Sequence, residues 1–132
     1  MISVETSVVV RYLVGTPRDQ AGRAAGLIEG DHEVGVSILV LAESAHVLRS
    51  FYRVARSDVA SQLIEFVTRA NVTPVEMSKP DVIDALVRAR SYASAPITDA
   101  LIAASARAYG AVPVYTFDER FGRLGTAVAT PT

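Results

Sequence analysis

The chain has 132 residues, half of them apolar and a fifth charged, which excludes an intrinsically disordered protein and predicts one globular domain over residues 1–132. It contains no cysteine, which excludes disulfides, thiolate metal sites and a cysteine nucleophile. Its net charge of −1 excludes a nucleic-acid-binding protein that is basic over its whole surface.

The N-terminal segment predicts neither a secretory leader nor a membrane anchor. The chain reaches Glu5 before a charged and then apolar leader can form. The longest apolar runs are far shorter than a bilayer-spanning helix requires. We therefore expect a cytoplasmic protein that does not associate with a membrane.

Apolar stretches of strand length alternate with segments of helical spacing along the whole chain. In the first half we expect a strand over Met1–Val4, helices over Thr6–Val14 and Arg18–Glu29, a strand over Val34–Ser37, and a helix from Leu39 to about Arg53.

The second half continues the alternation, with capping residues that indicate where its helices begin. We expect a helix opened by Ser57-Asp58 and ending near Ala70, a strand over Val72–Val75, a helix capped by Ser78 and ending near Tyr92, an Ala-rich helix capped by Thr98 or Ser94 and ending near Tyr109-Gly110, a strand over Val112–Thr116, and a candidate fifth strand over Ala127–Ala129.

This alternation predicts the α/β class, with a parallel sheet of four to five strands and helices on both faces. Sites in open sheets of this kind form at the carboxyl ends of the strands. Four acidic residues occur at such places: Glu5 after the first strand, Glu43 in the helix after the second, Asp99 in the first turn of the Ala-rich helix, and Asp118 after the strand that ends at Thr116.

Each of these acids also has a structural interpretation. Glu5 and Asp99 suit helix starts, and Asp118 suits a turn that begins Asp118-Glu119-Arg120. Glu43 is different, because the sequence places it on a largely apolar helix surface, where a carboxylate without a cation is costly. If the four converge, a divalent cation relieves their repulsion, and an all-carboxylate set favours Mg²⁺ or Mn²⁺ over zinc.

Other chemistries have less support in the sequence. His46 follows Glu43 by three residues, a spacing that binds iron in helical bundles, but no second such pair occurs. The chain has no Gly-x-Ser-x-Gly elbow, no phosphate-binding Gly-rich loop and no dinucleotide fingerprint. A phosphorelay receiver also gathers acids around magnesium, but it needs a Lys after a late strand, and Lys79 does not follow a strand in that way.

The chain resembles the PIN-domain ribonucleases, most closely the VapC-type toxins of toxin–antitoxin pairs. The resemblance covers essentially the whole chain and rests on four segments in family order: Val4–Leu13, Val36–Glu43, Thr98–Ala104 and Tyr115–Asp118. It implies a twisted parallel sheet with helices on both sides, an acid cluster that holds Mg²⁺ or Mn²⁺, and cleavage of RNA. It also implies a cognate antitoxin that binds across the active site, and a homodimer.

One position departs from the family pattern. The first acid of the motif is normally Asp, whereas this chain has Glu5. The extra methylene moves the carboxylate by up to roughly 1.5 Å, and a misplacement of about 1 Å at a reacting centre costs on the order of a hundredfold in rate. The alternative hypothesis is therefore a PIN-like module that no longer cuts and acts through protein binding.

We assign candidate roles on this basis. Glu5, Asp99 and Asp118 are candidate metal ligands, and Glu43 is a further ligand or orients the attacking water, so that all four are the candidate catalytic residues. Ser7 and Thr116 are candidate hydrogen-bond partners of the ligand carboxylates. Arginines, twelve in all against one Lys, suit phosphate recognition. Candidate contacts to RNA or antitoxin are Arg11 and a patch of Arg49, Arg53 and Arg56.

Overall fold

The structure is a computed structural model that describes residues 1–92 and 95–132. Its elements alternate between strands and helices as the sequence predicts. In chain order they are β1 (Ile2–Ser3), α1 (Thr6–Val14), α2 (Arg18–Ile28), β2 (Val34–Val36), α3 (Ile38–Ser50), α4 (Arg56–Thr68), β3 (Val72–Pro74), α5 (Lys79–Ser91), α6 (Ile97–Ala108), β4 (Val114–Tyr115), the 3₁₀ helix η1 (Glu119–Leu124) and β5 (Val128–Ala129).

The strands form two small parallel sheets. One has the order β1-β2-β3, and the other pairs β4 with β5. The α/β class and the parallel direction are confirmed, but the single sheet of four to five strands is wrong. The predicted strand over Val112–Thr116 forms a ladder only over Val114–Tyr115, because Pro113 has no N–H to donate to a neighbouring strand.

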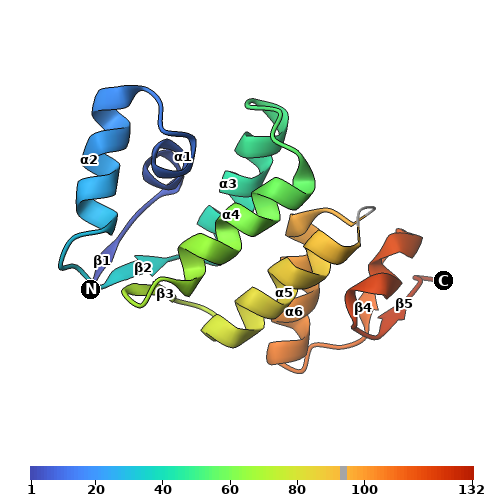
Figure 1. Ribbon diagram of the computed structural model, residues 1–132. Helices are drawn as coiled ribbons and strands as arrows, with labels where there is room; N and C mark the ends of the chain where they lie inside the picture. The colour runs from blue at the N-terminus through green and yellow to red at the C-terminus, as the bar shows by residue number, and fades with distance from the viewer. Residues whose placement is uncertain (93–94) are drawn as a thin grey trace.

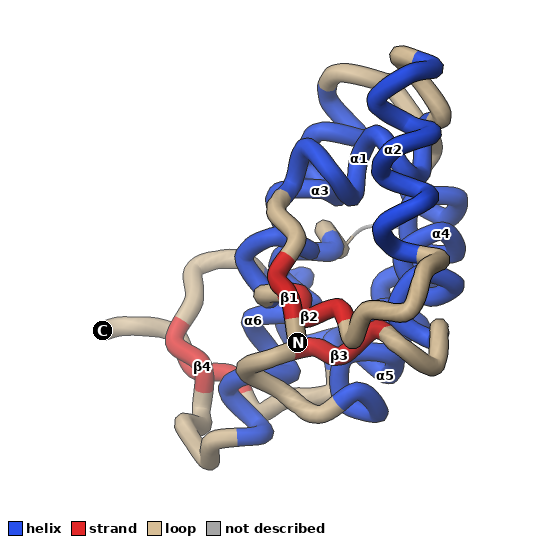
Figure 2. Tube along the Cα trace, turned by 90° about the vertical axis from the view of Figure 1, so that its left-hand side faces the viewer, coloured by secondary structure: helices blue, strands red, loops and turns tan. Residues whose placement is uncertain are grey.

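Helices surround the three-stranded sheet. In Figure 1 the chain passes from α1 and α2 at one end of the molecule, through α3 to α6, to η1, β4 and β5 at the other end. In Figure 2 the three strands lie between α1, α2 and α3 on one side and α5 on the other. All three residues of β2 are buried, as expected for a parallel strand that is covered on both faces.

One hydrophobic core joins the strands to the helices. Half of the largest buried side chains come from α3, α4, α5 and α6. Among them, Phe66 of α4 is 1% exposed and packs near the ring of Tyr12. The apolar side chains of α3 and α4 contribute to this core, since Leu41, Leu48 and Leu63 are fully buried. Phe51, which is 75% exposed, remains at the surface.

The start of α5 follows the sequence prediction, and two other predicted helix starts are wrong. Ser78 caps α5 by accepting a hydrogen bond from the N–H of Asp81. By contrast, α4 begins at Arg56 after an N-cap at Ala55 that has no side-chain hydrogen bond, so Ser57 lies inside the helix. Thr98 is likewise inside α6, whose N-cap is Pro96. The alternative cap, Ser94, lies outside the described residues.

The ends of the helices follow from backbone conformation. Gly15 ends α1 with a φ of 82°, and Gly110, with a φ of 70°, follows α6. Both angles are in the left-handed region that glycine adopts without steric cost. Helix α3 ends at Ser50 and not near Arg53 as predicted. Arg53 has a φ of 56°, which a right-handed helix does not allow. Across residues 1–92 and 95–132, no helix combines the length and apolar character that a membrane span needs.

Candidate active site

The four acids predicted from the sequence lie near the starts of four helices. Glu5 is the N-cap of α1 and Asp118 is the N-cap of η1. Asp99 lies in the first turn of α6, and Glu43 lies in the second turn of α3. Because α1 packs on α3, α3 on α6 and α6 on η1, these helices form a continuous row. We call the four side chains the acid row.

Glu5 caps the helix that follows it. Its carboxylate accepts hydrogen bonds from both the backbone N–H of Ser7, at 3.0 Å, and the Ser7 hydroxyl. A carboxylate in this position satisfies one of the open N–H groups of the first turn and interacts favourably with the helix dipole. The capping role therefore fixes where the Glu5 carboxylate lies, while leaving its side chain exposed to solvent.

Glu43 is exposed, which corrects the expectation of an apolar environment. The buried face of α3 carries Leu41, Ser44, Ala45 and Leu48, whereas Leu39, a neighbour of Glu43 on the helix surface, is 78% exposed. Glu43 is held by Thr6, whose buried hydroxyl donates to Oε1 of Glu43. Since Thr6 adjoins Glu5, this hydrogen bond joins the start of α1 to α3.

Asp99 and Asp118 interact electrostatically. Burial and the neighbouring charge of Asp118 raise the pKa of the Asp99 carboxyl, and Arg120 partly opposes that rise. Asp118 behaves in the opposite way, since hydrogen bonds from the Arg120 side chain and backbone lower its pKa to about 2. The guanidinium nitrogens Nη2 and Nε of Arg120 lie 2.7 Å and 3.1 Å from Oδ2 of Asp118. Arg120 is therefore the cation that balances this pair.

Three residues of the site were missed by sequence reasoning. Arg120 follows Asp118 by two residues, a spacing that was visible but was interpreted only as part of a turn. Thr6 is adjacent to Glu5. Glu76 follows β3 and accepts hydrogen bonds from the Ser37 hydroxyl and the Ile38 N–H, which anchors the start of α3. The Thr116 hydroxyl accepts a hydrogen bond from the Asp118 N–H at 2.9 Å, so this contact is with the backbone of Asp118, and a contact with its carboxylate stays a prediction.

The acid row could hold a divalent cation only through a few carboxylates, with water molecules as the remaining ligands. Within residues 1–92 and 95–132, no three Asp, Glu or His side chains are close enough together to form a metal cage. Asp99 and Asp118 nevertheless present two coupled carboxylates, and the pKa of Asp99 is raised by its partial burial and by the charge of Asp118, although Arg120 partly opposes that rise. Mg²⁺ is usually held by one or two carboxylates and several waters. This donor set suits such a hard cation.

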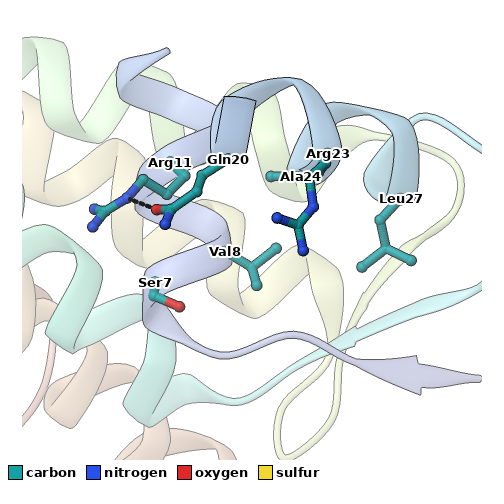
Figure 3. A pocket seen from close by; sticks show the side chains of 7 residues that line it. All are labelled: Ser7, Val8, Arg11, Gln20, Arg23, Ala24 and Leu27. Atoms are coloured by element: carbon teal, nitrogen blue, oxygen red, sulfur yellow. Dashed lines mark hydrogen bonds between the residues drawn. The ribbon is translucent and has the colours of Figure 1, made fainter. Parts of the chain in front are cut away.

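A cavity lies beside the acid row between α1 and α2. Its lining includes Ser7, Arg11, Gln20 and Arg23. Figure 3 shows the Arg23 side chain reaching from α2 toward Val8 of α1, while the Arg11 side chain turns toward Gln20. Nε of Arg11 donates to Oε1 of Gln20 at 2.8 Å, and its Nη1 lies 3.4 Å from the Tyr52 hydroxyl. Arg11 is thus held by two neighbours near the hydroxyl that contacts Glu5.

Comparison with known proteins agrees with this arrangement. A family model described as PIN domain matches residues 2–127 of the chain. The chain belongs to the PIN-domain family. PIN domains generally act as metal-dependent nucleases, so the fold is of a nuclease type. Searches of the curated proteins and of the solved structures each found no match to the chain.

Proposed function

We propose that this PIN-domain chain is a Mg²⁺- or Mn²⁺-dependent endoribonuclease, the toxin of a VapC-type toxin–antitoxin pair, and that it cleaves phosphodiester bonds in RNA. The observation that carries the proposal is the acid row, with two electrostatically coupled carboxylates, in a chain that matches the PIN family over residues 2–127. Asp99, Asp118 and Glu5 are the proposed metal ligands. Glu43 is proposed as a further ligand or as the group that orients water.

The protonation states of the coupled pair suit this role. Arg120 keeps Asp118 ionised at any pH well above about 2, so this carboxylate is anionic throughout the physiological range, and a cation would have to compete with Arg120 for its oxygens. Asp99 gives up its proton less readily because it is partly desolvated beside Asp118. When bound, a divalent cation polarises a phosphoryl oxygen and lowers the pKa of its water.

Hydrogen bonds orient the other two acids. Thr6 donates to Glu43 and Ser7 donates to Glu5, so each carboxylate has one fixed oxygen and one oxygen that remains available. A fixed carboxylate loses less entropy when it engages a ligand or water. The position of Glu5 is set by its helix cap, and the family pattern prefers the shorter Asp there. We therefore propose that Glu5 lowers the rate of cleavage.

The proposed partners are a cognate antitoxin and a second copy of the chain, in the cytoplasm. Two large apolar side chains beside the acid row are exposed, Leu39 to 78% and Phe117 to 82%. Leu39 lines the same depression as Glu43, and Phe117 directly precedes Asp118 in the sequence. Apolar side chains exposed next to a polar site are typical of surfaces that bind another protein.

The test is cleavage of a mixed pool of RNA with Mg²⁺ or Mn²⁺, comparing the wild-type chain with Glu5→Asp and Asp99→Asn. We expect Glu5→Asp to raise the rate, by up to roughly a hundredfold if its carboxylate moves into place. Asp99→Asn should abolish metal-dependent cleavage. The matched control is Asp81→Asn, which removes a first-turn carboxylate of α5, outside the acid row; it should cut like the wild type.

Two outcomes would contradict the proposal. Full activity of Asp99→Asn would show that the Asp99 carboxylate is not needed for cleavage. If neither the wild type nor Glu5→Asp cuts the pool although both are folded and bind metal, the alternative of a protein-binding PIN module would replace the nuclease.

A further inference from the structure

A second pocket lies where the start of α6 meets α3 and the start of α4. Its lining residues come from all three helices: Ala45, His46, Arg49, Arg56, Pro96, Ile97 and Thr98. Its volume is about 160 Å³, below the roughly 300 Å³ at which small-molecule sites usually begin. A pocket of this size suits a single charged group better than a whole nucleotide.

The pocket has an excess of positive charge. Burial, together with the like charges of Arg49 and Arg120, lowers the pKa of Arg56. Nη1 of Arg56 is buried and has no hydrogen-bond partner among the described residues. Arg49 donates its own Nη1 to the carbonyl of Val54, which fixes its position. The described residues that line the pocket include no carboxylate, so an anion would satisfy Arg56 and relieve the repulsion between these cations.

The two helix starts at the pocket add to its preference for an anion. Neither Ala55, the N-cap of α4, nor Pro96, the N-cap of α6, has a side chain that bonds to the first-turn N–H groups. The positive end of each helix dipole therefore faces this region without a capping side chain. Each helix also carries an acid in its first turn, Asp58 in α4 and Asp99 in α6, which offsets part of the dipole. The preference for an anion therefore rests mainly on the arginines and on Nη1 of Arg56, which lacks a hydrogen-bond partner in the described part of the chain.

The pocket is continuous with the acid row. A neighbouring depression is lined by Glu43 and four other residues of α3, among them His46, and by Thr98. His46 and Thr98 line both hollows, and Thr98 directly precedes Asp99 in α6. A chain that passes from Glu43 along His46 reaches Arg56 without leaving this surface.

We propose that the pocket formed by His46, Arg49, Arg56 and Thr98 binds a backbone phosphate of RNA, next to the phosphate that reaches the acid row. This inference rests on the proposed function for the choice of RNA as the ligand. Arginine forks match phosphate oxygens in geometry as well as in charge, and a polyanion with regularly spaced phosphates can occupy both hollows at once. Contacts of this kind position the nucleic acid without reading its sequence.

The test measures binding in the absence of divalent metal, so that it does not depend on cleavage. A short labelled single-stranded RNA of mixed sequence is titrated with the full chain in EDTA at several salt concentrations. We expect Arg56→Gln to weaken binding about tenfold. The slope of log K against log salt should fall by about 0.7, the loss of one phosphate contact on a single strand. Arg56→Lys keeps the charge but loses the planar guanidinium, so its affinity for RNA should lie between those of the wild type and Arg56→Gln.

The matched control is Arg18→Gln, which removes the same charge from the exposed start of α2, away from this pocket. It should bind RNA within about twofold of the wild type. Thermal melting of each variant verifies the fold, and Arg49→Lys repeats the test at the second arginine.

The inference is overturned if Arg56→Gln binds RNA as the wild type does, or if Arg18→Gln loses as much affinity. It is also overturned if polyglutamate, an acidic peptide probe, binds more tightly than RNA and depends more strongly on Arg56. The two proposals fail separately. Arg56-dependent binding of RNA without any cleavage supports the pocket and contradicts the nuclease, whereas cleavage that is lost in Asp99→Asn and unchanged in Arg56→Gln does the reverse.

Discussion

The central contact at the scale of single residues is the ion pair between Arg120 and Asp118. The guanidinium contacts both carboxylate oxygens and also interacts with Asp99. A bidentate pair of this kind is stronger and more directional than a lysine contact. Arg120 therefore neutralises the negative charge of these carboxylates, as a metal ion does in an all-carboxylate site. A cation that binds this pair would compete with Arg120.

This contact predicts a change in titration. Replacing Arg120 with Gln removes the side-chain hydrogen bonds that are the largest cause of the low pKa of Asp118, about 2, and keeps the bond from the backbone N–H of residue 120. The pKa should therefore rise part of the way toward the ordinary value near 3.9. NMR titration of the side-chain carboxyl carbon measures it. Arg120→Lys, which keeps the charge and loses the fork, should give a smaller rise. An unchanged pKa in Arg120→Gln would contradict the assignment.

The sign of the linked stability follows from the same shift. A carboxyl with a lower pKa in the folded chain binds protons more weakly than in the unfolded chain, so its contribution to stability is fully present above about pH 3.9. That contribution is lost as the pH falls toward about 2. The difference in stability between the wild type and Arg120→Gln should therefore diminish through this acid range.

The sequence indicated the residue types of the site better than their environments. It placed Glu5, Asp99 and Asp118 at helix starts and turns, where the structure has them. It misjudged Glu43, because periodicity along one helix does not reveal which face the rest of the chain covers. Arg120 was missed because its partner depends on the local backbone of η1 and not on a long-range pattern.

Among the helices, the accuracy of the prediction depended on whether the signal was local. The bounds of α1, Thr6–Val14, agree with the prediction residue for residue, because Gly15 ends the helix through its own backbone conformation. The start of α4 was missed because Ser57-Asp58 resembles a cap, whereas the helix begins one residue earlier, at Arg56, without a side-chain cap. The division of the strands into two sheets could not be predicted, because it depends on contacts between segments that are distant in the sequence.

The caps predict a contrast between two serines. Ser78→Ala removes the hydrogen bond to the Asp81 N–H and should lower the free energy of unfolding by about 1 kcal/mol. Ser57→Ala changes an exposed residue inside α4 and should leave stability within about 0.5 kcal/mol of the wild type. Urea denaturation of both variants measures the difference. Equal losses would contradict the assigned N-caps of α4 and α5.

For the whole molecule, the four acids join the chain's ends into one arrangement. Glu5 lies at the start of the chain and Asp118 near its end, and the helices α1, α3, α6 and η1 connect them through successive contacts. Neither α4 nor α5 contributes an acid to this row. If a cation binds this row as proposed, it would link the first and last helices of the row and so stabilise the fold as a whole.

This connection predicts stabilisation by metal. A ligand that binds only the folded chain stabilises it by about 2.7 kcal/mol at one hundred times its dissociation constant. Mn²⁺ should therefore raise the melting temperature of the wild type, and the increase should be lost in Asp118→Asn but kept in Asp81→Asn. Because burial and Asp118 raise the pKa of Asp99, protons compete with the metal there, and the increase should shrink as the pH is lowered. An equal increase in Asp118→Asn would rule out binding at the pair.

The placement of the acids near helix starts has a practical consequence for the rest of the surface. The turn over residues 29–33, between α2 and β2, is exposed and leads into the amino end of its strand, while Glu43 lies beyond the carboxyl end of that strand. Affinity handles, fluorophores or inserted peptides grafted into this turn would thus be remote from the acids. The turn over residues 29–33 is therefore a suitable site for attaching the protein to a solid support when its binding to RNA is measured.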